Sequence, residues 1–110
     1  MAQEQFIHTA IPLPIAKIRA FCQQYKVVEF ALFGSVLRED FDQDSDIDVL
    51  VVFHEEAHPT LLDLVVMEEA LETIFGRKVD LITRKEIETS PNYIRRNAIL
   101  GSAQVIYASG

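Results

Sequence analysis

The chain has 110 residues, of which 49% are hydrophobic, and its 17 acidic and 10 basic side chains give a formal net charge of −7. This length and composition predict one domain with enough apolar residues to fill a core, while the acidity and the lack of a basic run argue against nucleic acid as the principal partner. The apolar runs are too short for a transmembrane helix or a signal peptide, so we expect a cytoplasmic protein without a membrane partner.

The first half of the chain alternates helical and extended patterns. Apolar residues recur at helical spacing after Pro14, and Cys22 lies among them, so this single cysteine is expected to be a buried thiol without a disulfide partner in the chain. In chain order we expect a helix over residues 15–25, a strand over 27–33 ending at Gly34-Ser35, a helical turn over 35–38, an acidic loop over 40–45 and a strand over 47–53.

The second half repeats the alternation, with clear signals at the ends of its elements. Gly76 is expected to stop a long helix as a left-handed cap, and Thr83 with Glu86 forms a capping-box pattern. In chain order we expect a loop over residues 54–59, a helix over 60–75, a strand over 78–83, a short helix after Thr83, a helix over 92–100 with Ser90 as N-cap and Gly101 as its end, and a strand over 104–108. The whole pattern predicts an α/β (α+β) domain with a mixed sheet of about four strands and helices packed against it.

Two carboxylates open the second predicted strand. Asp46 and Asp48 flank Ile47, and a strand alternates faces, so both should point the same way about 7 Å apart while Ile47 and Val49 point into the core. Burying carboxylates at the start of such a strand costs free energy unless a positive charge compensates for them. The pair is therefore a candidate site for a divalent cation.

Two further features should converge on the same end of the sheet. Gly34 allows a ligand to approach the backbone closely, and its amide, the Ser35 hydroxyl and the following turn can hold phosphate oxygens. Asp80 is a lone acid inside an apolar strand, where a buried, unpaired carboxylate needs a cation or a proton. Three carboxylates without a His/Cys pattern suit Mg²⁺ or Mn²⁺ better than Zn²⁺, and two such ions on a triphosphate would support phosphoryl or nucleotidyl transfer.

The spacing of these features resembles that of a known superfamily. Gly34-Ser35, ten intervening residues, Asp46-x-Asp48 and a distal Asp80 are similar to the pattern of nucleotidyltransferases of the DNA polymerase β type. Residues 33–38, residues 45–51 and the tail after residue 94 resemble the MNT (minimal nucleotidyltransferase) group in particular. The resemblance covers roughly residues 15–108.

This resemblance implies a fold, an activity and a set of roles. Members of the MNT group commonly act as antitoxins of HEPN RNase toxins, so the implied reaction is transfer of AMP from ATP to a tyrosine of a HEPN-domain partner. Carried over residue by residue, Gly34 and Ser35 would bind the triphosphate, and Asp46 and Asp48 would ligate two Mg²⁺ ions. Asp80 would ligate the catalytic ion and accept the proton of the attacking hydroxyl.

Each feature also has a structural interpretation. Asp48 could form an ion pair with Arg38 or Lys78, and Arg38 could reach a phosphate or neutralise acids of the following loop. Arg95 and Arg96 are expected to have surface or interface roles rather than catalytic ones. Two other functions stay open: an antitoxin that neutralises its partner by binding alone, and a nucleotidyltransferase acting on RNA or a small molecule, which the acidic composition and small size disfavour.

Overall fold

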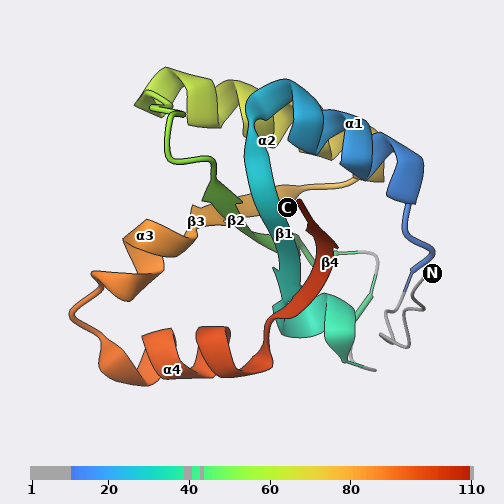
Figure 1. Ribbon diagram of the computed structural model, residues 1–110. Helices are drawn as coiled ribbons and strands as arrows, with labels where there is room; N and C mark the ends of the chain where they lie inside the picture. The colour runs from blue at the N-terminus through green and yellow to red at the C-terminus, as the bar shows by residue number, and fades with distance from the viewer. Residues whose placement is uncertain (1–10, 39–40, 43, 110) are drawn as a thin grey trace.

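The computed structural model describes residues 11–38, 41–42 and 44–109, in which helices pack on both faces of a four-stranded sheet (Figure 1). Asp40, which we assigned to the acidic loop, lies outside the described residues. The elements in chain order are α1 (Ile15–Tyr25), β1 (Val27–Phe33), the 3₁₀ turn η1 (Gly34–Leu37), β2 (Ile47–Phe53), α2 (Leu61–Phe75), β3 (Val79–Thr83), α3 (Arg84–Glu88), α4 (Tyr93–Ser102) and β4 (Gln104–Ala108).

The sheet has the order β3-β2-β1-β4 and is mixed, as predicted. β1 runs antiparallel to both β2 and β4, whereas β2 and β3 are parallel and are joined by the crossover helix α2. This connection matters for function because it sets the starts of β2 and β3 side by side. The two strands that carry the predicted carboxylates are therefore neighbours.

Alternation along the strands divides the core between the two faces of the sheet. On one face α1 and α2 cover a larger cluster that includes Phe30, Val49 and Met67. On the other face α3 and α4 cover a smaller cluster that includes Leu50 and Ile99 (Figure 1). Asp48 alternates with Ile47 and Val49, whose side chains lie in the larger cluster. The side chain of Asp48 is therefore on the other face of the sheet, with the smaller cluster.

The cysteine and the helix termini agree in part with the expectations. Cys22 is buried in the larger cluster, and burial raises the pKa of its thiol to about 12, as expected for an inert buried thiol. Gly76 caps α2 in the left-handed conformation. Thr83 accepts a hydrogen bond from the Glu86 amide, which is one half of the predicted capping box. A complete capping box, which we did not predict, joins Thr60 and Asp63 at the start of α2.

The predicted ends of the last helix were wrong. Asn92, not Ser90, is the N-cap, because its side-chain oxygen accepts a hydrogen bond from the Arg95 amide, while the Ser90 hydroxyl accepts one from the Asn92 amide within the preceding turn. Gly101 does not end the helix either, since α4 continues through it to Ser102. An Asn directly after a Ser-Pro pair offers a competing cap.

The outer edge of β3 is covered by carboxylates from α2. Glu72 accepts a hydrogen bond from the Val79 amide at 3.2 Å, and Glu68 accepts one from the Leu81 amide at 3.0 Å. The two glutamates are one helical turn apart, so they lie on the same side of α2 and match alternate amides of the strand. Two outward-facing amides of β3 are therefore bonded without another strand.

No helix within the described ranges is both long enough and apolar enough to cross a membrane.

Candidate active site

The sequence-predicted residues meet where β1 ends and β2 and β3 begin. Phe33, Asp48 and Asp80 are register partners across the three strands, so Asp48 stands in one row with Asp80 beside it. Gly34 follows Phe33 directly and opens η1, with Ser35 next to it. The expected convergence of Gly34, Asp48 and Asp80 on one end of the sheet is therefore confirmed.

Gly34 is required by its backbone and by its neighbour. Its φ is +76°, a left-handed conformation that L side chains rarely adopt. A Cβ at this position would overlap Asp48 Oδ2 and lie 3.2 Å from Asp48 Cγ. The missing side chain thus leaves the space that the Asp48 carboxylate occupies against the end of β1.

Asp48 is the most perturbed carboxylate of this group. Its pKa is raised from 3.8 to about 6, first by burial and then by the negative charges of Asp80 and Asp46. The charges of Arg38 and Arg95 act in the opposite direction and lower the pKa of Asp48. The site is thus a half-buried acid between like charges, with arginines close enough to offset them in part.

The exposure of the other two acids differs from the expectation. We predicted that Asp80 would be buried in the middle of its strand, but it is exposed, and Asp46 is exposed as well. β3 is an edge strand of five residues, and its second residue lies where the sheet meets solvent. Asp80 therefore needs no partner for its own stability, and its closeness to Asp48 is what makes it a candidate.

Arg95 is the residue of this site that sequence reasoning missed. It lies on α4, one helical turn before Ile99, which is buried in the smaller cluster beneath the sheet. Residues four apart share a helix face, so Arg95 is on the side of α4 that faces the sheet, where its charge reaches Asp48. The spacing of Arg95 to Ile99 was the available signal. Arg95 is exposed, as expected of a surface residue, and its charge acts on Asp48 as well.

Arg77 orders the loop that leads into Asp46. Its guanidinium donates hydrogen bonds to the carbonyl oxygens of Asp42 and Ser45, at 3.0 and 3.2 Å, and lies 4.5 Å from the centre of the Phe41 ring. The Ser45 hydroxyl accepts a hydrogen bond from the Asp42 amide and donates one to the Asp42 carboxylate, as expected of a turn residue. Arg77, two residues before β3, therefore holds the loop that precedes Asp46.

The donor set suits a divalent cation, although the carboxylates do not yet converge. Within the described part of the chain, no three side chains of His, Cys, Asp or Glu are gathered closely enough to hold a metal ion as they stand. However, Asp46 and Asp80 raise the pKa of Asp48 by their charge, and a divalent cation relieves that kind of repulsion. Oxygen ligands alone match Mg²⁺ or Mn²⁺.

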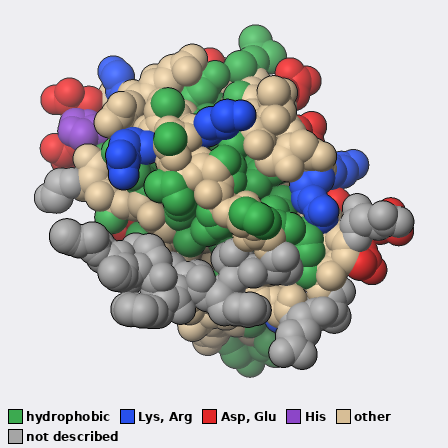
Figure 2. Space-filling view, turned by 90° about the vertical axis from the view of Figure 1, so that its right-hand side faces the viewer, with side chains coloured by type: hydrophobic (Ala, Val, Ile, Leu, Met, Phe, Trp, Pro, Cys, Tyr) green, Lys and Arg blue, Asp and Glu red, His purple; other side chains and the backbone are tan. Residues whose placement is uncertain are grey.

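The surface shows no basic patch on the face in Figure 2. There the described Lys and Arg side chains are scattered among apolar and neutral ones.

The comparisons with known proteins point to one enzyme family. Residues 15–101 match the model of the nucleotidyltransferase domain family. A Methanocaldococcus jannaschii protein, provisionally named a protein adenylyltransferase, is 42% identical over 74 residues, which cover 67% of this chain and 72% of the relative.

Two solved structures share the fold. A protein described provisionally as a minimal nucleotidyltransferase superposes with a TM-score of 0.63 at 32% identity, over 82% of this chain and 86% of its own. A chain from the complex of a tri-AMPylated Shewanella oneidensis HEPN toxin with its MNT antitoxin superposes with a TM-score of 0.60 at 16% identity, over 86% and 70% of the two chains. At this low identity the second likeness shows the fold alone.

Proposed function

This chain belongs to the nucleotidyltransferase domain family, and from that premise we propose that it is an antitoxin that transfers AMP from ATP to a tyrosine of a HEPN-domain toxin and so silences it. The observation that carries the proposal is the pairing of Asp48 with Asp80 in one parallel ladder, against the space left by Gly34. The similarity to a protein adenylyltransferase and to the fold of an MNT antitoxin chain supports a protein acceptor. We further propose that the chain acts as a single minimal nucleotidyltransferase domain.

Binding of the triphosphate falls to the turn after β1 and to the arginines. The amides at the start of η1 and the Ser35 hydroxyl would donate hydrogen bonds to phosphate oxygens, because Gly34 has no side chain to block their approach. Arg38 follows this turn, and Arg95 reaches the site from α4, so both would offset the negative charge of the nucleotide. In this role Arg38 binds phosphate, which was one of its two predicted roles.

The three carboxylates would hold Mg²⁺, or Mn²⁺, and orient the reacting groups. Bound Mg²⁺ would supply Lewis-acid stabilisation of the charge that develops on the phosphate oxygens. The tyrosine oxygen attacks the α-phosphorus, the bond to the bridging oxygen breaks, and diphosphate leaves. Asp80, the exposed carboxylate beside Asp48, accepts the proton of the tyrosine hydroxyl. Asp46 and Asp48 are ligands in this scheme, and the half-buried Asp48 is the more rigid of the two.

The test is a mass measurement on the partner. Incubation of the chain with Mg²⁺, ATP and its HEPN-domain partner should add the mass of one or more AMP groups to the partner, and chelation of Mg²⁺ should prevent this. Asp48→Asn should abolish the addition, whereas Asp44→Asn, which makes the same chemical change at an exposed acid in the preceding loop, should leave it intact. An unmodified verified partner, or full activity of Asp48→Asn, would sink the proposal.

Neutralisation by binding alone is a second candidate, and one observation favours it. Tyr93 and Ile94 are 61% and 69% exposed on α4, directly before Arg95, and large exposed apolar side chains mark contact surfaces. A partner seated there would cover the neighbouring carboxylates. In cells, an Asp46→Ala/Asp48→Ala double variant that still protects from the toxin at normal expression would favour binding, and loss of protection with retained complex formation would favour catalysis.

A further inference from the structure

A cavity of about 460 Å³ opens where the parallel strands β2 and β3 end. Val51 and Thr83 are register partners there, and Asp48 with Asp80 pairs three residues earlier, so about 10 Å of strand separates the cavity from the carboxylates. β2 leads to α2 on one face of the sheet, whereas β3 leads into α3 on the other face. Crevices form where chains leave neighbouring parallel strands toward opposite faces, and in open α/β sheets they are common ligand sites.

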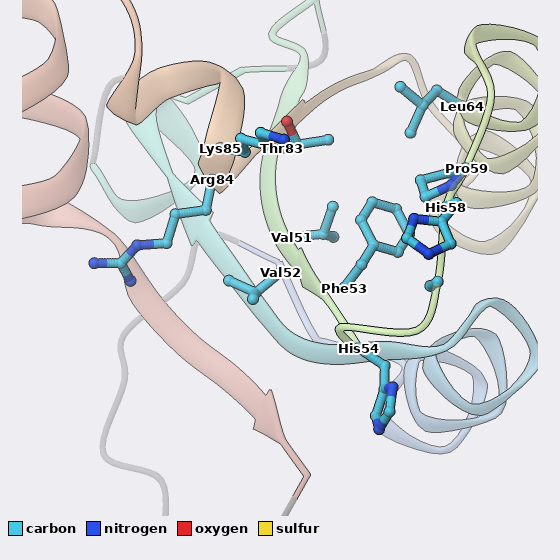
Figure 3. A pocket seen from close by; sticks show the side chains of 11 residues that line it. Val51, Val52, Phe53, His54, His58, Pro59, Leu64, Thr83, Arg84 and Lys85 are labelled. Carbon is cyan, nitrogen blue, oxygen red and sulfur yellow. The ribbon is translucent and has the colours of Figure 1, made fainter.

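The walls of this cavity are largely apolar. Val51 is fully buried at its floor, while Phe53 and Leu64 are partly exposed to it. Figure 3 shows Val51 and Phe53 between Thr83 with Lys85 on one side and His58 with Leu64 on the other. The volume falls within the roughly 300–1,000 Å³ that is usual for small-molecule sites.

The lining of the cavity holds two basic side chains, Arg84 and Lys85. Among the residues that the structure describes, no Asp or Glu lines it, although the chain holds 17 acids and 10 bases. The Arg84 guanidinium points away from the cavity (Figure 3) and is engaged by Glu88 at 2.8 Å and Glu29 at 3.8 Å. Lys85 forms no ion pair with any residue that the structure describes, so its ammonium is the available cation at the rim.

We infer that this cavity is a second binding site, separate from the carboxylate site, for a small amphipathic organic anion. The apolar body of such a molecule, a medium-chain aliphatic carboxylate for example, lies on Val51, Phe53 and Leu64, and its carboxylate lies at the rim against Lys85. Burial of the chain supplies most of the affinity, and the lysine selects for the anion over a neutral molecule of the same size.

An NMR titration of the full chain with octanoate tests this inference, with 1-octanol as the neutral probe of equal length. Octanoate should give saturable shifts confined to the amides of the cavity, and it should bind about tenfold more tightly than octanol, as one favourable charge contact implies. Lys85→Glu should weaken octanoate binding by at least about tenfold while leaving octanol unchanged. Lys17→Glu, which makes the same charge change on exposed α1, should leave both probes unchanged.

Three results would overturn the inference. One is the absence of saturable shifts at millimolar octanoate, and another is equal affinity for octanoate and octanol. The third is an equal effect of Lys85→Glu and Lys17→Glu, which would mean that the probe responds to net charge alone. Urea unfolding of each variant checks that a loss of binding is not a loss of fold, and Lys85→Gln, which removes the charge without reversing it, should then show an intermediate loss. Because the probes contain no nucleotide, these outcomes are independent of the proposed adenylyl transfer.

Discussion

Gly34 and Gly76 share a left-handed backbone but differ in their surroundings, which makes them a matched pair for testing the site. Their φ angles are +76° and +70°. A Cβ on Gly76 would meet no atom within 4 Å, whereas a Cβ on Gly34 would overlap Asp48 Oδ2. Gly34→Ala therefore adds a displacement of Asp48 to the same backbone strain that Gly76→Ala produces alone.

The expected magnitudes separate the two effects. A left-handed alanine costs about 1–2 kcal/mol, so both variants should lose about that much free energy of unfolding. In Gly34→Ala the Asp48 carboxylate must also move by roughly 1 Å to reach ordinary van der Waals distance, and a misplacement of that size costs about 100-fold in rate. Gly76→Ala should keep AMP transfer within about twofold of the parent chain, since the change lies outside the site.

Urea unfolding and AMP transfer to the partner, measured on the same preparations at saturating Mg²⁺ and ATP, check both numbers. Similar losses of stability with a selective loss of activity in Gly34→Ala are the expected result. If the two variants lost activity equally, or if Gly34→Ala kept full activity, the contact between Gly34 and Asp48 would have no bearing on the reaction. The reasoning from the close approach would then be refuted.

Three further predictions concern stability, each measured by urea unfolding. Because the pKa of Asp48 is raised to about 6, the folded chain holds this proton more tightly than the unfolded chain does. The parent chain should therefore lose stability relative to Asp48→Asn as the pH rises from about 4 to about 6.5. An Asp48→Asn variant that is less stable than the parent at pH 7 would contradict this. Glu68→Ala should cost about 1 kcal/mol by freeing an amide of β3. The exposed Glu69→Ala should cost little, and equal losses would argue against the hydrogen bond. Asn92→Ala should lower the free energy of unfolding by about 1 kcal/mol, because it removes the N-cap of α4. A larger loss in Ser90→Ala would instead support Ser90 as the N-cap.

The elements were predictable where a local pattern determines them. The strand over residues 47–53 and the helix over 15–25 match β2 and α1, because an apolar run and a helical repeat identify them without tertiary information. Gly76 ends α2 as predicted, since only glycine adopts its left-handed conformation at no cost. The Gly34-Ser35 and Asp46-x-Asp48 motifs likewise follow from local chemistry.

The rest depends on contacts between distant segments. The exposure of Asp80 follows from the position of β3 at an edge, and strand order is not readable from one strand. Arg95 reaches Asp48 because α4 packs back on the sheet through Ile99, which follows Asp48 by about fifty residues. In each case two elements must be placed before the side chain has a role.

The glutamates along β3 also determine how the sheet can grow. With its outer amides already bonded to Glu68 and Glu72, β3 cannot accept a further strand without breaking two hydrogen bonds to carboxylates. Of the two strands at the margins of the described sheet, that leaves β4 as the one where a partner's strand could join. Assembly by strand addition is thereby directed to the margin farther from Asp80.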